Sequence, residues 1–455
     1  MADENIADTI ITNGVSNHTN HLSKKQKLQS FISSFEIRSE FNHHDPKIAR
    51  INNGSFGSCP GSIIKAQQRY QLEFLKQPDR FFYTELQSRV LKSRVSIKEL
   101  INAEDVSEVS IVDNVTTAVA IVLRHVSWEF CEGRFERGDV VVILECAFEA
   151  VKKSIEAYVS RAGGEVVVVE LKFPVLSEEE IVERFRVGIR KGKEGGRRIR
   201  LAIIDHITSM PCVVVPVKEM VRVCREEGVE NVFVDAAHAI GSVKVDVRDI
   251  GADFYVSNLH KWLFCPPSVA FFYCRKSRVS EGLHHPVVSS EYGNGLAIES
   301  SWIGTRDYSS QLVVPEVLEF VSRFEGGIDG IRKRNHDAVV EMAEMLVKAW
   351  GTNLGCPLDM CPSMAMIGLP SCLGILSNDH AQKLRDHLRK EFGVEVPLYY
   401  HGLKDGEVGV RDGNGIITTY ARISHQVYNT VDDYLKFRDA VNQLVEKKFT
   451  CEMLF

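Results

Sequence analysis

The sequence predicts an α/β protein: a large domain built on a mainly parallel sheet covered by helices, followed by a smaller α+β domain. Between residues 106 and 275, short apolar runs rich in Val, Ile and Phe alternate with helix-length segments. Most of these runs are apolar throughout, as in parallel strands buried on both faces. Beyond residue 326, two helical segments flank a strand-like run that begins TYARIS, which indicates a second domain.

Composition limits the classes of function. The chain has 455 residues, of which 44% are hydrophobic and 25% charged, and a net charge of -6, which is ordinary for a globular protein. No basic stripe predicts nucleic-acid binding, and no apolar run approaches the length of a membrane span. The eleven cysteines lack the spacing of a disulfide framework or a zinc site, so we expect free thiols, a reducing compartment and no metal.

The N-terminal residues indicate the expected location of the protein and the start of its folded part. Residues 1–28 are polar and start acidic, without the apolar core of a signal peptide or the Arg-rich character of a transit peptide. We therefore expect a disordered segment over 1–28 and a cytoplasmic protein, with the nucleus left open. A large domain over 29–325, which includes an N-terminal arm, and a small domain over 326–455 complete the expected organisation.

The strands of the large domain are expected in seven runs. In chain order these are EVSIVDN (108–114), GDVVVIL (138–144), GEVVVVEL (164–171), RLAIID (200–205), VFVD (232–235), DFYVSN (253–258) and VAFFYC (269–274). The run at 164–171 is expected to be buried like the others. Ligands in such sheets lie at the carboxyl ends of the strands.

Residues able to bind a ligand gather at those carboxyl ends. Thr116 and Thr117 fall at a strand-to-helix turn, where free N–H groups and the helix dipole favour a phosphate. An ordinary helix N-cap is the alternative. Phe148 falls at the next such turn, where an aromatic ring either stacks on a heterocycle or packs in the core. The turn from Asp205 to Ser209 exposes further polar side chains near a strand end.

The stretch 231–274 carries the central pair. Asp235 closes one strand, and Lys261 follows the next in SNLHKW. Taken singly, each is most often a turn residue or a solvated strand end. Together at adjacent strand ends they suit one chemistry, because a lysine holds pyridoxal phosphate as a Schiff base and an aspartate keeps the pyridine nitrogen protonated.

Two further segments add candidates. The loop INNGSFGSCP at 51–60 either approaches a ligand closely through Gly54 and Gly57 or is a plain surface loop, and Asn53 in it is a candidate substrate contact. Arg422, in TYARISHQVYN, is either an exposed strand arginine or a bidentate clamp for a substrate carboxylate.

With Asp235-Ala-Ala-His238, SNLHK ending at Lys261, and Arg422 in RISHQVYN, the chain resembles the class V branch of fold-type I pyridoxal phosphate enzymes over about residues 35–445. Within that branch, the motifs NNGSFGSCP, CAFEAVKKSI, DHITSMP and WIGTRDYS are similar to those of plant L-cysteine desulfhydrases. The resemblance implies a fold-type I large domain, pyridoxal 5'-phosphate as cofactor, L-cysteine as substrate, and a homodimer with shared active sites.

The resemblance also implies a role for each candidate. Lys261 holds the cofactor and later moves the Cα proton, Asp235 pairs with the pyridine nitrogen, and His238 reaches the phenolic oxygen. Phe148 stacks on the ring. The phosphate is expected on Thr116, Thr117, His260 and the partner subunit's Thr305, and the substrate on Arg422 and Asn53.

Two departures from the family pattern shape the expected reaction. Asn258 stands three residues before the lysine, where desulfurases often carry Ser, and Ser257 lies one residue earlier. No cysteine lies between Cys372 and Cys451, so the loop 399–414 lacks a persulfide-forming thiol. We therefore expect a carbon–sulfur lyase, an L-cysteine desulfhydrase that releases hydrogen sulfide, pyruvate and ammonia by β-elimination.

Other outcomes of the same cofactor chemistry stay open. They are a desulfurase that yields alanine, an epimerase and an aminotransferase. A non-catalytic relative is disfavoured, because a chain freed from catalysis need not keep Lys261, Asp235 and Arg422 together.

Overall fold

The structure is a computed structural model that describes residues 31–278, 282–403 and 408–455. Residues Ile32–Phe455 form one compact unit. The segment predicted to be disordered, 1–28, lies outside the described residues. The predicted domain boundary between residues 325 and 326 falls just before helix α15 (Gly327–Trp350) and stays a prediction.

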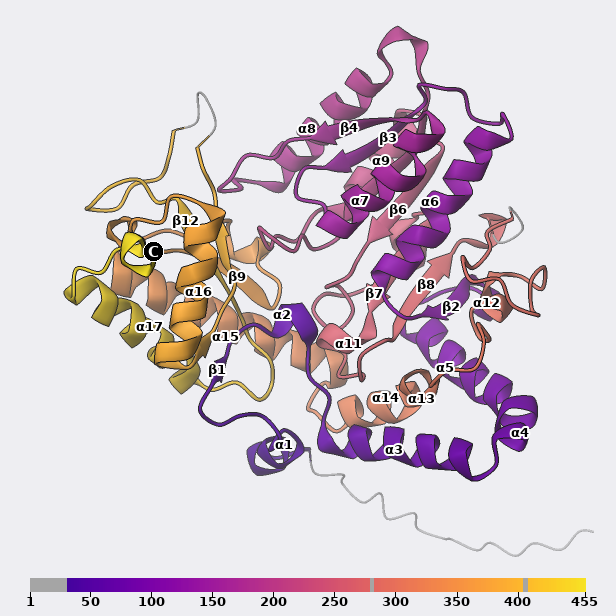
Figure 1. Cartoon of the computed structure of the whole chain (residues 1–455), viewed down its shortest axis with the longest axis horizontal. Coiled ribbons are helices and arrows are strands. Elements are labelled where there is room, and N and C mark those ends of the chain that lie inside the picture. The colour runs from indigo at the N-terminus through magenta and orange to yellow at the C-terminus, as the bar shows by residue number, and fades with distance from the viewer. Residues whose placement is uncertain (1–30, 279–281, 404–407) are drawn as a thin grey trace, which may run out of the picture. The chain divides into compact units, whose positions relative to one another are not determined.

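The large sheet contains seven strands in the order β2-β8-β7-β6-β5-β3-β4 (Figure 1). The strands are β2 (Val109–Val112), β3 (Val140–Leu144), β4 (Glu165–Val169), β5 (Ile199–Asp205), β6 (Asn231–Asp235), β7 (Phe254–Asn258) and β8 (Ala270–Cys274). Strands β3 to β7 pair in parallel, whereas β8 runs antiparallel to both of its neighbours. The predicted α/β class and the mainly parallel seven-stranded sheet are confirmed.

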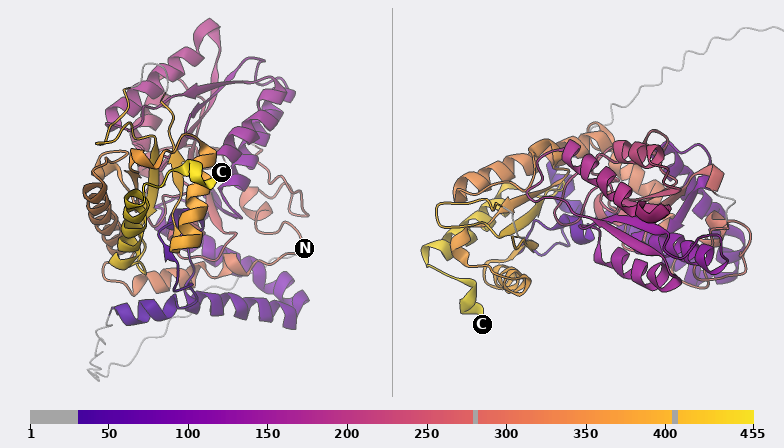
Figure 2. Two further views of the ribbon diagram at one scale, coloured as in Figure 1. Left: turned by 60° about the vertical axis from the view of Figure 1, so that its left-hand side comes forward. Right: turned by 90° about the horizontal axis from the view of Figure 1, so that it is seen from above.

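Helices cover both faces of this sheet (Figure 2). Alternate strand residues point to opposite faces, so Val141 and Ile143 of β3 share a core with helices α6 (Val115–Cys131) and α7 (Glu149–Tyr158). Val142 and Leu144 belong instead to the core formed with α8 (Glu178–Gly192) and α9 (Val217–Glu226). Each residue at a strand end therefore faces one helix pair or the other.

Strand β4 corrects one expectation. The run at 164–171 was expected to be buried, but β4 lies at the edge of the sheet and pairs only with β3. Only Val169 of this strand is fully buried, and the Val168 side chain is 50% exposed. A run of valines reports β propensity, but it does not distinguish a central strand from an edge strand.

The N-terminal arm and the connections are mainly helical. They comprise α1 (Ser34–Glu40), β1 (Ala49–Arg50), α2 (Asn53–Phe56), α3 (Gly61–Lys76), α4 (Pro78–Arg80), a π-helical turn (Phe81–Glu85), α5 (Leu86–Leu100), α10 (Val247–Ile250), α11 (Leu259–Trp262), α12 (Leu296–Glu299), α13 (Ser309–Leu312) and α14 (Val314–Ser322). Strand β1 pairs in parallel with β10 (Val394–Glu395). The arm therefore reaches from the large sheet to the C-terminal elements.

The C-terminal part is α+β, as predicted. An antiparallel sheet of order β11-β12-β9 combines β9 (Met364–Gly368), β11 (Leu398–Tyr400) and β12 (Thr419–Ser424). Helices α15, α16 (Asn378–Phe392) and α17 (Val431–Glu446) accompany it. Thr430 and Asp433 form a capping box at the start of α17. Every residue of β12 is buried, including Arg422.

Candidate active site

A cavity lies where the carboxyl ends of β5, β6 and β7 meet the amino ends of α6 and α7. Five of the predicted site residues line it: Thr116, Phe148, Asp235, His238 and Lys261. The rest of the lining is Asn114, Val115, Val151, Asp205, Ile207, Ser209, Ala237 and Asn258. We call this space the lysine cavity. It brings together side chains from segments that are more than 140 residues apart in the sequence.

Lys261 is held at the cavity by the short helix α11, which begins directly after β7. Its Nζ lies 3.2 Å from His238 Nε2. Burial, together with the nearby positive charge of Arg422, lowers the pKa of Lys261 to about 8, although the charge of Asp235 opposes both effects. A larger fraction of this amine is therefore neutral near pH 7 than for an ordinary lysine, and the neutral amine is the nucleophile towards an aldehyde.

Two aspartates line the cavity at the carboxyl ends of neighbouring strands. Asp205 and Asp235 are register partners at the ends of β5 and β6, and each is 4% exposed. Asp235 Oδ1 accepts the Ala237 N–H at 3.0 Å. Asp205 Oδ2 has no hydrogen-bond partner in the described part of the chain. Burial raises the pKa of both carboxyl groups. The sequence pointed to the Asp205 turn but not to this pairing.

The buried Trp262 fixes the tautomer of His238. Its indole Nε1 donates to His238 Nδ1 at 3.4 Å, so the neutral ring carries its proton on Nε2. Burial holds the pKa of His238 well below its usual value, and Lys261 lowers it further. The imidazole therefore presents an N–H donor towards Lys261 and the cavity.

The start of α6 supplies donors at the opposite wall. Asn114 caps the helix through a hydrogen bond from the Thr117 N–H, at 3.0 Å. Asn258 Oδ1 accepts the Val115 N–H at 3.1 Å, which ties this helix to β7. Thr116 is exposed and lines the cavity at this helix start, where free N–H groups and the helix dipole favour an anion. Ser257 is bonded to Ala236 and Ile240 and does not line the cavity.

Arg422 is a buried cation without a carboxylate partner among the described residues. Its side chain donates to Ser209 O at 2.8 Å, to Asn52 Oδ1 at 3.0 Å and to Ser55 Oγ at 2.9 Å. It is 3% exposed, and burial lowers its pKa. A buried guanidinium that lacks a counter-ion favours an anionic ligand. The burial of Arg422 excludes the exposed strand arginine, and its role as a clamp for a substrate carboxylate stays a prediction.

The loop at 51–60 contacts this arginine through residues that the sequence did not single out. Asn52 and Ser55 hold Arg422, whereas Asn53 is turned elsewhere. The Asn53 side chain donates to Asn429 Oδ1 at 2.8 Å and accepts from the Tyr428 hydroxyl at 2.7 Å. Asn53 is fully buried and does not line the lysine cavity, so its role as a substrate contact stays a prediction without geometric support.

Residues 52–57, which we call the N-terminal bridge, join Arg422 to the lysine helix. Gly57 has φ +68°, and a Cβ placed there would lie 1.9 Å from the His260 carbonyl oxygen and 2.8 Å from Lys261 Cα. At Gly54 a Cβ would lie 2.5 Å from Met364 Sδ and 3.5 Å from His238 Cε1. At Gly57 only glycine permits the approach, because φ is positive and the neighbouring atoms are backbone, whereas at Gly54 the Met364 side chain would have to move. The bridge therefore fixes the separation between the lysine and the arginine.

Arg422 does not line the lysine cavity, and neither do three of the residues predicted to bind the phosphate. Thr117 is committed to Asn114, and His260 Nδ1 lies 3.1 Å from Val269 O, with its pKa lowered to about 4 by burial. Thr305 is exposed in the loop before α13. The predicted phosphate roles of these residues stay predictions.

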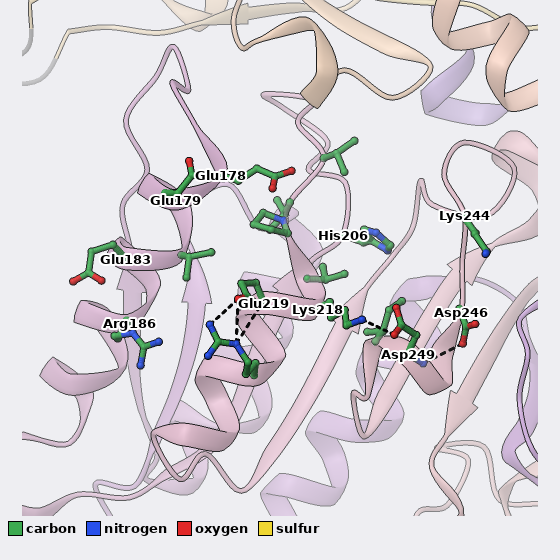
Figure 3. Close-up of a pocket in the computed structure, with 17 residues that line it drawn as sticks. Glu178, Glu179, Glu183, Arg186, His206, Lys218, Glu219, Lys244, Asp246 and Asp249 are labelled. Atoms are coloured by element: carbon green, nitrogen blue, oxygen red, sulfur yellow. Dashed lines mark hydrogen bonds and ion pairs between the residues drawn. The ribbon is translucent and has the colours of Figure 1, made fainter.

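A wider groove of about 1070 Å³ opens on the other face of the sheet (Figure 3). His206, which follows Asp205, lines this groove because successive residues at a strand end face opposite ways. Four charged residues of the groove pair with one another: Lys218 with Asp249 at 2.5 Å, and Arg222 with Glu219 at 2.6 Å. Such paired surface charges do not call for a ligand, whereas the buried charges of the lysine cavity do.

The residues of the lysine cavity fit pyridoxal phosphate. They offer the Lys261 amine with a lowered pKa, the buried Asp235 carboxylate for a ring nitrogen, an N–H donor from His238, and a helix start for a phosphate. Phe148 is 54% exposed at the cavity wall, as a ring that stacks on a bound heterocycle must be before binding.

Comparisons with known proteins agree with this fit. A family model for class-V aminotransferases matches residues 58–367, and the chain belongs to that family. The chain is 61% identical over 438 residues to an L-cysteine desulfhydrase of Arabidopsis thaliana, which covers 96% of both chains. It is also 61% identical over 437 residues to a probable chloroplastic L-cysteine desulfhydrase of the same plant, covering 95% of this chain and 90% of that one.

A solved structure shows the same fold at low identity. A cysteine desulfurase from Thermococcus onnurineus NA1 matches with a TM-score of 0.66 and 18% identity, over 87% of this chain and 94% of that one. The resemblance expected from the motifs is confirmed, and pyridoxal phosphate follows from the family as the cofactor.

Proposed function

We propose that this protein catalyses β-elimination on L-cysteine and releases hydrogen sulfide, pyruvate and ammonia. The observation that carries the proposal is the pairing of Lys261 with a buried, carboxylate-free Arg422 across the N-terminal bridge. This arrangement offers one group for an amino acid's carboxylate and another for the chemistry at its Cα. The relatives at 61% identity bear the name L-cysteine desulfhydrase, which supports the choice of substrate.

The bound cofactor would supply an electron sink that stabilises negative charge at the substrate Cα. Arg422 would hold the substrate carboxylate by two parallel hydrogen bonds. Lys261, displaced from the cofactor by the substrate amine, would take the Cα proton as general base, and its pKa of about 8 suits that task. Orientation by Arg422 would keep the Cβ–S bond aligned for departure of the sulfide.

The remaining cavity residues would hold the cofactor. Asp235 would keep the ring nitrogen protonated, and the Nε2–H of His238 would donate to the phenolic oxygen. Phe148 would stack on the ring. Thr116, at the start of α6, would bind the phosphate through its hydroxyl and amide.

Elimination is favoured over the desulfurase reaction by the lack of an acceptor thiol. No cysteine lines the lysine cavity in the described part of the chain. The sequence of the loop 399–414 contains none either, although residues 404–407 lie outside the described residues. Without a cysteine thiolate of the protein to attack the sulfur atom of the substrate, that sulfur leaves as free sulfide.

A product assay tests the reaction. The purified, cofactor-loaded protein is incubated with L-cysteine, and sulfide, pyruvate and alanine are quantified together. Equal sulfide and pyruvate are expected. Sulfide with alanine, dependent on added thiol, would point to a desulfurase. Lys261→Ala is expected to abolish turnover while keeping the fold, and activity close to wild type in that variant would contradict the assigned base.

We also infer a homodimer with shared sites. Thr305 is exposed, and its loop is tied to α3 by the Gln71 side chain, which donates to Asp307 Oδ2 at 2.8 Å. Leu72 and Leu75 on the same helix are 66% and 69% exposed, which suits burial against a second copy. Light scattering tests the mass. Mixing inactive Lys261→Ala and Thr305→Ala subunits is expected to restore part of the activity.

For location, we propose the cytoplasm. One relative at 61% identity is named chloroplastic, so a plastid is the alternative location. Within the described residues, none of the helices combines the length and apolar character that a membrane crossing requires. A fluorescent fusion of the full chain, imaged in plant cells, would reveal a plastid location if the proposal is wrong.

A further inference from the structure

Two aspartates occupy matched positions at one end of the lysine cavity. Strands β5 and β6 pair in parallel with Asp205 opposite Asp235, and opposed residues on neighbouring strands point to the same face. Both continue the face of Ile203 and Phe233, which packs with α6 and α7. Both also line the cavity. The two carboxyl groups are therefore neighbours in one buried space.

Their surroundings do not compensate two negative charges. The titratable groups that face the pair are Lys261 on α11, Lys152 on α7, Cys146 and Glu145 in the turn before α7, and His238 and Tyr255. The Lys152 ammonium donates to the Glu145 carbonyl at 2.6 Å. Lys261 is the amine that the proposed function commits to the cofactor. Asp205 Oδ2 is left without a hydrogen bond in the described structure.

We propose that Asp205 and Asp235 together hold one proton, so that the pair carries a single negative charge. Asp205 thereby adjusts the basicity of Asp235, which is the partner of the cofactor's ring nitrogen. The proposal rests on the proposed function, which places pyridoxal phosphate in this cavity. Two neighbouring carboxylates in apolar surroundings do not both ionise without a large cost. One shared proton leaves one negative charge, which matches the single positive charge of a protonated ring nitrogen.

The directions of the two pKa values agree with this arrangement. Burial raises the pKa of both groups, and the charge of Asp235 raises that of Asp205 further. The proton then resides on Asp205, and Asp235 is the one carboxylate that meets the ring nitrogen. Asp205 is thus a positioning residue that acts through Asp235.

Cofactor affinity gives the first test. Asp205→Asn resembles the protonated carboxyl and cannot ionise. If the pair already carries one charge, apo Asp205→Asn binds pyridoxal phosphate within about fivefold of wild type, as measured by absorbance titration. Asp235→Asn is expected to lose more than that. A loss above about fivefold in Asp205→Asn would mean that Asp205 contributed a charge of its own, and would overturn the proposal.

The stability of the apo-protein gives a second test that does not involve the cofactor. A carboxyl group whose folded pKa is raised binds more protons in the folded state, so its contribution to stability falls as pH rises above the unfolded value of about 3.9. The amide in Asp205→Asn cannot ionise, so the variant does not lose stability in this way as pH rises. The thermal midpoint of the variant, relative to wild type, is therefore expected to increase between about pH 5 and about pH 8. A constant difference would overturn the proposal.

Asp253 provides the matched control. It is 2% exposed, accepts the Val232 N–H at 2.7 Å and pairs with Arg225 at 2.8 Å, so its charge is compensated. Asp253→Asn is expected to unfold at a lower temperature than wild type at every pH tested. If wild type bound no pyridoxal phosphate, the proposed function would fail, while the pH dependence of Asp205→Asn would still decide whether the carboxyl pair exists.

Discussion

Gly57 offers the sharpest test of how the N-terminal bridge positions the lysine. Its backbone, at φ +68° and ψ -164°, lies in a region that is essentially reserved for glycine. A Cβ at this position would meet three backbone atoms of His260 and Lys261, at 1.9, 2.6 and 2.8 Å. Backbone atoms cannot rotate away as a flexible side chain can, so either the bridge or α11 must move.

The expected cost of Gly57→Ala has two parts. The unfavourable backbone conformation costs about 1–3 kcal/mol, and forcing a methyl group into a packed contact costs a further ~1–3 kcal/mol. We therefore expect the free energy of unfolding to fall by about 2–6 kcal/mol. Because the contact is with Lys261 itself, we also expect weaker binding of pyridoxal phosphate.

Gly228→Ala is the matched control. Gly228 has φ +70°, but nothing lies within 4 Å of a Cβ built there. Its replacement should cost about 1–2 kcal/mol for the backbone alone and leave cofactor binding unchanged. Both variants are compared by urea denaturation of the apo-protein and by absorbance titration with the cofactor. Equal losses of stability in the two variants, with normal cofactor binding in Gly57→Ala, would refute the reasoning.

Three further predictions follow from single contacts. Asn52→Ala removes one hydrogen bond to the charged Arg422, which is worth about 1.5–3 kcal/mol. Steady-state kinetics should therefore show KM for L-cysteine rising about ten- to hundredfold. A fall in kcat at unchanged KM would contradict this role. Trp262→Phe removes the donor to His238 Nδ1, so ¹⁵N NMR of histidine-labelled apo-protein should show both tautomers in place of one. The rate at which the Lys261 amine in the apo-protein combines with pyridoxal phosphate should rise with pH and level off above about 8, because only the neutral amine reacts; a rise that continues to the ordinary lysine value of 10.5 would contradict the depressed pKa.

Much of the fold follows from local features of the sequence. Buried strands and amphipathic helices leave different periodicities, so six of the seven runs were predicted with the correct type and environment. Strand β4 was misjudged because edge and central strands can share one composition, and only pairing distinguishes them. The placement of Asp235 and Lys261 followed from the rule that parallel sheets bind ligands at the carboxyl ends of their strands.

The sequence by itself determined the α/β class, the placement of the lysine and its aspartate at strand ends, and the helix start that is predicted to bind a phosphate, because each depends on a short segment and on the geometry of one element. Only the tertiary structure decided that Asn52, not Asn53, holds Arg422, that Trp262 fixes the tautomer of His238, and that Asp205 stands beside Asp235. These contacts join segments far apart in the chain, or depend on which way one side chain turns. Such pairings are set by the packing of the whole fold, and no local pattern of residues records them.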